Sequence, residues 1–259
     1  MYLKIVAGII LLLSTSCTGG HSQQNEPIQQ PGTSTIPVDF TDVKSIPLPG
    51  GFERIALQKE SFGAWLRTVS LKKDNTVYLY DGTPKPNQQA QFAVLNISVG
   101  DKNLQQCADA IMRLRAEYLF YQQDFGNISF TDNEGGIYQF DAPHTQKRFA
   151  AYLQKVFGMC GTASLSKQLL PVNLMKMQVG DVLIKGGFPG HAVIVMDMAE
   201  NNEGEKIYLL AQSYMPAQDV HILKNTNDAV ASPWYALNTS QDIFTPEYHF
   251  TNDQLKTWW

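Results

Sequence analysis

The stretch Gly180–Asp197, GDVLIKGGFPGHAVIVMD, constrains the fold more than any other part of the chain. Two runs within it, Val182–Lys185 and Ala192–Met196, are rich in Val, Ile and Leu, which is typical of strands buried on both faces. The turn between them consists of Gly, Phe and Pro residues that permit a tight reversal. This turn places His191 at the start of a buried strand. A histidine in that place is either a positioned catalytic base or a residue that caps the strand.

The composition suits a globular domain with a sizeable core. The chain has 259 residues, of which 44% are hydrophobic and 17% are charged, and such a chain can bury a core of its own. The net charge is −4 and the Lys and Arg residues are scattered. A nucleic-acid partner is therefore not expected.

The N-terminus looks like an export signal that ends at a cysteine. Ile5–Leu13 is an apolar run too short to span a bilayer as a mature helix. The small residues that follow lead into Cys17, and this resembles the lipobox of bacterial lipoproteins. Ser14 occupies the position where that pattern usually has leucine. The resemblance implies a lipoprotein signal peptide over residues 1–16 and a diacylated Cys17, and the alternative is an ordinary cleaved signal.

A lipid on Cys17 would tether an exported protein to a membrane of the cell envelope without spanning it. The residues from Thr18 to about Pro37 are polar and rich in Gln, Ser, Gly and Pro, so they cannot bury enough apolar area to fold. The sequence therefore predicts a flexible tether over residues 17–38 and a single globular domain over residues 39–259.

The clearest helix is predicted over Asp101–Gln123. Its apolar residues recur at helical spacing: Leu104, Cys107, Ala108, Ile111, Leu114, Tyr118 and Leu119. Cys107 would lie on the buried face in the first two turns. It is either a small core residue or a thiol whose thiolate is stabilised by the helix N-terminus.

The other two cysteines could form a disulfide or stay as free thiols. If Cys17 carries lipid, Cys107 and Cys160 remain, and an oxidising compartment would allow them to pair. Cys107 lies on a core-facing helix, whereas Cys160 lies in a glycine-flanked turn far along the chain. We therefore expect two unjoined thiols.

The strand after His191 brings a polar partner to it. The acidic and amide-rich segment Ala199–Lys206 predicts a turn, and antiparallel pairing then places His191 opposite Gln212–Tyr214. The Gln212 amide can accept the imidazole N–H and select the tautomer of the ring. Asp197 is not a candidate for this role, because six strand residues separate it from His191 by about 20 Å.

The sequence gives little support for other kinds of catalytic or metal site. There is no H-E-x-x-H or C-x-x-C motif and the histidines do not cluster, so neither a metal nor a cofactor is predicted. Nucleophile-elbow, Walker and dinucleotide signatures are also missing from the sequence. A carboxylate pair of the glycoside-hydrolase type stays open as a third hypothesis, because its sequence spacing is unconstrained.

From about Phe52 to its C-terminus the chain resembles a family of bacterial lipoproteins catalogued only as a domain of unknown function. The resemblance lies in WLRTVSLK, LYDGTPKPNQ, LQQCADAIMRLRAEYL, GDVLIKGGFPGHAVIV, LLAQSYMPAQDVHILKN and SPWY. It brings no established activity.

More distantly, the layout resembles the NlpC/P60 and CHAP papain-like peptidases and amidases. Their order of a helix-borne cysteine, a G-D strand, a G-H strand and a polar residue is matched by Cys107, Gly180-Asp181, Gly190-His191 and Gln212. The D-C-S-G-type signature is replaced by Gln105-Gln106-Cys107-Ala108-Asp109, Gln212 replaces the usual His, Glu or Asn, and the spacing from cysteine to histidine is long. The resemblance implies an α+β, papain-like domain with an antiparallel sheet and packed helices.

The leading hypothesis is a membrane-anchored lipoprotein that hydrolyses an amide, with a peptidoglycan peptide as substrate. Cys107 would attack the carbonyl, His191 would take and return the proton, and Gln212 would orient His191. The alternative is a non-catalytic envelope lipoprotein that uses the same fold as a binding module. Its groove would be lined by aromatic residues: Trp65, Tyr80, Tyr214 and Trp234.

Overall fold

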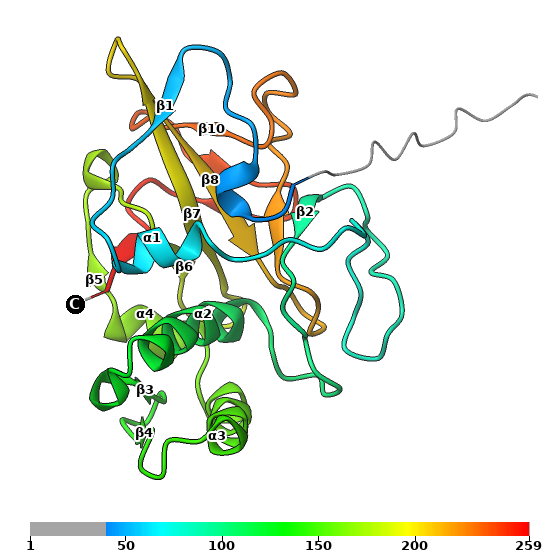
Figure 1. The fold of residues 1–259 in the computed structure, drawn as a ribbon, viewed down its shortest axis with the longest axis vertical. Helices are drawn as coiled ribbons and strands as arrows, with labels where there is room; N and C mark the ends of the chain where they lie inside the picture. The colour runs from blue at the N-terminus through cyan, green and yellow to red at the C-terminus, as the bar shows by residue number, and fades with distance from the viewer. Residues whose placement is uncertain (1–39, 259) are drawn as a thin grey trace, which may run out of the picture. The chain divides into compact units, whose positions relative to one another are not determined.

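The computed structural model describes residues 40–258, which belong to one compact unit (Figure 1). The predicted signal peptide, Cys17 and the tether lie outside the described residues. Its helices are η1 (Val43–Ser45), α1 (Phe62–Leu66), α2 (Cys107–Tyr121), η2 (Phe125–Asn127), α3 (Gln146–Met159), α4 (Thr162–Gln168) and η3 (Leu174–Lys176). None of these helices is both long and apolar enough to cross a membrane.

The strands are mixed with the helices up to η3, and from β6 onward they follow one another. They are β1 (Phe52–Arg54), β2 (Gln91–Val94), β3 (Ser129–Thr131), β4 (Ile137–Gln139), β5 (Leu170–Pro171), β6 (Val182–Lys185), β7 (His191–Asn201), β8 (Lys206–Gln212), β9 (His221–Leu223), β10 (Tyr235–Ala236), β11 (Ile243–Phe244), β12 (His249–Phe250) and β13 (Leu255–Thr257).

One large antiparallel sheet organises the described residues. Its strand order is β2-β9-β8-β7-β6-β13-β5, with β1 also paired to β7 and β10 to β8. Every pairing in it is antiparallel. The predicted strands Val182–Lys185 and Ala192–Met196, and the strand expected after the Ala199–Lys206 turn, are adjacent at its centre as β6, β7 and β8. The predicted mixture of helices with an antiparallel sheet is therefore confirmed.

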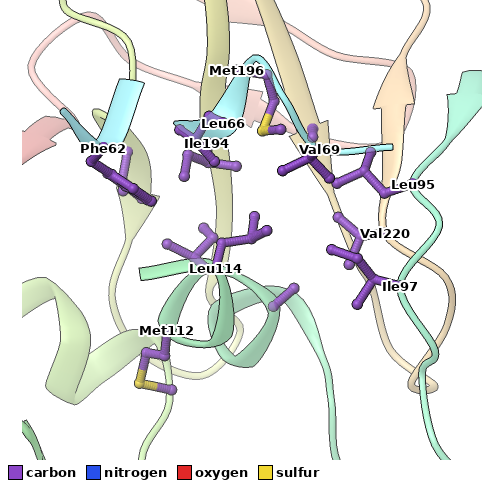
Figure 2. Packing of buried hydrophobic residues seen from close by; sticks show 14 of the residues in the cluster. Phe62, Leu66, Val69, Leu95, Ile97, Met112, Leu114, Ile194, Met196 and Val220 are labelled. Carbon is purple, nitrogen blue, oxygen red and sulfur yellow. The ribbon is translucent and has the colours of Figure 1, made fainter. Parts of the chain in front are cut away.

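The strand β7 is buried on both faces, as its continuous apolar run predicted. Ile194 and Met196 belong to the cluster that packs against α1 and α2 (Figure 2). Val193 and Val195 point the other way, into a second cluster formed with the C-terminal strands. Successive side chains of a strand point to opposite faces of the sheet. Alternate residues of β7 therefore belong to the two clusters.

The helix α2 begins later than predicted, at Cys107 instead of Asp101. The segment before it is held as a loop by the turn that follows β8, because the Ser213 hydroxyl donates to the Gln105 carbonyl and the Ala217 amide donates to the Asn103 side chain. These contacts compete with helical hydrogen bonds in the segment. Cys107 is therefore the first helical residue, and α2 packs against β7.

A buried carboxylate ties the outer elements to the central strand. Asp197 is fully buried on β7 and accepts hydrogen bonds from Arg54 Nε at 2.7 Å and Arg67 Nε at 2.5 Å. Its Oδ1 also accepts the amide of Met198 at 2.8 Å. Arg54 ends β1 and Arg67 caps α1, so one carboxylate fastens both elements to the sheet.

We expect Asp197→Ala to lower the free energy of unfolding by about 3–5 kcal/mol, because it leaves two partly buried guanidinium groups unpaired. The matched control is Glu117→Ala, which breaks the more exposed pair with Arg113 on α2 and should cost about 0.5 kcal/mol or less. Urea denaturation measures both variants. Equal, small losses in the two variants would contradict this role of Asp197.

Candidate functional site

His191 and Gln212 meet at one end of the central strands. His191 is the first residue of β7, and its Nε2 lies 2.8 Å from Oε1 of Gln212, the last residue of β8. The register of these strands, with Ile194 opposite Ala211, brings the two ends together. Both side chains are buried, with exposed fractions of 2% and 1%.

The orientation of the Gln212 amide follows from its other contacts. Gln212 Nε2 lies 2.7 Å from a carboxylate oxygen of Glu247, which can only accept. It also lies 3.4 Å from Nε2 of His221, whose Nδ1 is 2.9 Å from the carbonyl of Asp219 and so carries the proton. The amide oxygen of Gln212 must therefore face His191. His191 donates its Nε2–H to that oxygen, and its Nδ1 is left as the basic nitrogen.

Glu247 is held in turn by two residues of the loop before β2. Lys85 Nζ lies 2.5 Å from one carboxylate oxygen and Asn87 Nδ2 lies 2.9 Å from the other. Burial alone would raise the pKa of Glu247, but the hydrogen bond and charge of Lys85 hold it below its usual value. Sequence reasoning missed these residues, because no motif or spacing links residues 85 and 87 to residue 247.

Cys107 lies at the same end of β7 as His191. Its thiol is close to the backbone amides of Ala108 and of Ala192, the residue that follows His191. The pKa of Cys107 is raised to about 11, mainly by burial and also by the nearby Asp109, while these amides oppose the rise. Thiolate stabilisation by the helix N-terminus is one of the two alternatives for Cys107, and desolvation outweighs the effect of the amides. The thiol is therefore protonated at neutral pH.

Asp109, in the first turn of α2, is a buried carboxyl group without a cationic partner among the described residues. Its Oδ2 accepts the amide of Gln106 at 2.9 Å. Burial raises the pKa of Asp109 to about 8, so most of it is uncharged at pH 7. In that state it adds little negative charge beside Cys107.

Aromatic rings cover His191. The centroids of Tyr214 and Tyr248 lie 4.6 and 4.8 Å from the imidazole, and that of Phe250 lies 5.9 Å away. Burial lowers the pKa of His191 to about 4. The site thus holds a neutral imidazole and a neutral thiol under two half-buried tyrosines. In this conformation the buried imidazole offers little access to a reacting group, which a general base requires.

The remaining sequence candidates lie apart from this site. Cys160 caps the C-terminal end of α3, and both Cys107 and Cys160 are free thiols, as expected. Trp234 is buried in the core with its Nε1 bonded to the carbonyl of Pro47 at 2.7 Å, so it cannot line an open groove. Trp65 packs against Phe62 instead. Within residues 40–258, no three His, Cys, Asp or Glu side chains are grouped to hold a metal ion.

We expect His191 to be in the Nε2–H tautomer, as measured by the ¹⁵N shifts of its ring. Replacing the pair together, as Lys85→Met with Glu247→Leu, removes the closer of the two acceptors that orient Gln212 without leaving a buried charge unpaired. A mixture of both tautomers should then appear. Asn87→Ala, which leaves the Gln212–Glu247 contact in place, is the control and should keep the wild-type spectrum. An unchanged tautomer in the double variant would rule out orientation through Glu247.

Comparison with known families gives one match. A family described as a domain of unknown function (4846) matches residues 43–143 and 138–257. No curated protein matches the chain, and no solved structure does either.

Proposed function

The chain belongs to the family of the domain of unknown function 4846, and within it we propose a cysteine-dependent amide hydrolase with a papain-like arrangement of Cys107, His191 and Gln212. The observation that carries the proposal is the directed chain of hydrogen bonds from Glu247 through Gln212 to His191. It leaves a free Nδ1 on an imidazole whose neighbouring residue contacts the thiol of Cys107.

The reaction follows from these protonation states. Because both groups start neutral, Nδ1 of His191 takes the thiol proton as the sulfur of Cys107 attacks the amide carbonyl. The first amides of α2 lie beside the sulfur and are the donors available to the oxyanion. His191 then gives the proton to the departing amine, which leaves a thioester on Cys107. Water, deprotonated by His191, releases the acid and restores the thiol.

Gln212 acts by positioning His191. Its oxygen holds the Nε2–H and stabilises the imidazolium that forms when Nδ1 is protonated. Glu247 holds the Gln212 amide in this orientation. Its carboxylate also supplies a negative charge that acts on His191 through Gln212. The low resting pKa of His191 makes this stabilisation necessary, since a charged imidazole is costly in a buried site.

The proposed substrate is a peptidoglycan peptide and the proposed location is the cell envelope, with a lipid on Cys17 as the membrane anchor. The sequence of the first residues supports the anchor, and the amide chemistry of the site is compatible with such a peptide. The alternative is a binding module without catalysis, which the burial of His191 and the neutral thiol favour.

Cleavage of peptidoglycan peptides, followed by mass spectrometry, separates the two proposals. Cys107→Ser changes one atom, so we expect the fold to persist while the rate falls by about 10³-fold or more. Gln212→Ala should leave more activity, because it leaves both reacting groups, Cys107 and His191, in place. Saturable peptide binding by the wild type, without any product, would instead establish the binding module.

Membrane attachment is tested separately. If Cys17 is acylated, Cys17→Ala should move the protein out of the membrane fraction and abolish metabolic labelling with a fatty acid. The control is Cys160→Ala, which should leave both unchanged. Membrane association that persists in Cys17→Ala without label would end the lipoprotein proposal while leaving the amide-hydrolase proposal untouched.

A further inference from the structure

A cavity of about 750 Å³ lies beside α2, away from the Cys107–His191 site. Its lining includes Arg115 but neither Cys107 nor His191. Arg115 follows Cys107 by eight residues on the helix, which is about 12 Å along the axis. The cavity is therefore a separate feature, and its volume is in the range of small-molecule sites, roughly 300–1,000 Å³.

The guanidinium of Arg115 is enclosed by aromatic rings. Its central carbon lies 5.1 Å from the ring centroid of Phe62, 5.4 Å from that of Tyr118 and 5.3 Å from that of Trp258. Such contacts engage the faces of the group and leave its N–H donors for an acceptor. Throughout residues 40–258 no carboxylate forms an ion pair with it, and Asp124 acts on it only from a distance.

This arrangement places a positive charge without an ion-pair partner among residues 40–258 in the wall of the cavity. Burial lowers the pKa of Arg115, yet a guanidinium stays charged at any physiological pH. Lys176 and Lys206 also line the cavity, and in the described part of the chain neither has an ion-pair partner. Asp181 is the acidic side chain of the lining. Three cations and one carboxyl group on a protein of net charge −4 indicate a preference for an anion.

The wall also has an apolar part. Besides Phe62 and Trp258 it includes aliphatic and thioether side chains: Ile55, Leu57, Met175, Met177 and Val179. A ligand that fills this space must bury an apolar body as well as present a charge. Asp181, whose carboxylate accepts the amide of Gln178 at 2.8 Å, disfavours a second negative charge close to it.

We propose that this cavity binds a small amphiphilic monocarboxylate. Its carboxylate takes the planar N–H donors of Arg115, and its apolar body lies against the aromatic and aliphatic wall. Lys176 and Lys206 draw the anion in, so that binding weakens as salt increases. The site is independent of the amide-hydrolase proposal, because none of its residues takes part in that mechanism.

The test uses purified full-length protein and two probes of matched size, N-acetylphenylalanine with a charged carboxylate and N-acetylphenylalaninamide with a neutral amide in its place. Binding is followed through tryptophan fluorescence and the indole NMR signals, since Trp258 is in the wall. We expect the acid to bind with a Kd of about 1 mM or lower, and the amide at least tenfold more weakly. Inorganic phosphate, which lacks an apolar body, should also bind more weakly than the acid.

Variants assign the binding to the cavity. Arg115→Gln should weaken binding of the acid at least tenfold, and Lys206→Gln, which leaves the aromatic rings untouched, should weaken it severalfold. Arg148→Gln removes an exposed arginine of α3 and is the matched control, expected to bind like the wild type. Equal binding of acid and amide, phosphate binding tighter than the acid, no saturable binding of the acid, or unchanged binding in Arg115→Gln would each overturn the proposal.

Discussion

The burial of β7 on both faces is the constraint on which the rest of the structure depends. Both faces of this strand need apolar cover, and the two clusters of the core provide it on opposite sides of the sheet. The helix side is covered by α1 and α2, and the other side by C-terminal segments that return to the sheet. Since hydrophobic burial is the dominant favourable term in folding, the positions of these outer elements follow from the requirements of one strand.

The polar groups on this strand are tolerated because each has partners. At one end Asp197 accepts hydrogen bonds from Arg54 and Arg67. At the other end His191 donates to Gln212, and Gln212 donates to Glu247. A buried polar group that lacks a partner costs about 1–3 kcal/mol. Both clusters therefore lock the elements that supply the partners, which are β1 and α1 for Asp197 and the β11–β12 hairpin for Gln212.

The same burial governs the chemistry of the candidate site. Desolvation raises the pKa of Cys107 and lowers that of His191, so it opposes the ion pair that many cysteine hydrolases form before they meet substrate. The directed hydrogen bonds from Glu247 act in the opposite sense, since they stabilise an imidazolium. In the proposed mechanism the charge separation of this neutral pair therefore accompanies the reaction, and the rings of Tyr214 and Tyr248 lie over the imidazole.

The sequence by itself determined the central strands, their antiparallel order and the meeting of His191 with Gln212. Period, turn residues and loop length are local properties, and they fix which residues of neighbouring strands face each other. The papain-like assignment, the anchor and the catalytic roles stay predictions.

Tertiary structure alone decided that α2 begins at Cys107, because loop contacts with Ser213 and Ala217 replace its first helical turn. It alone joined Lys85 to Glu247 and enclosed Arg115 with Trp258. Side chains so far apart in the sequence come together only through packing, and their pKa values depend on the water that packing removes.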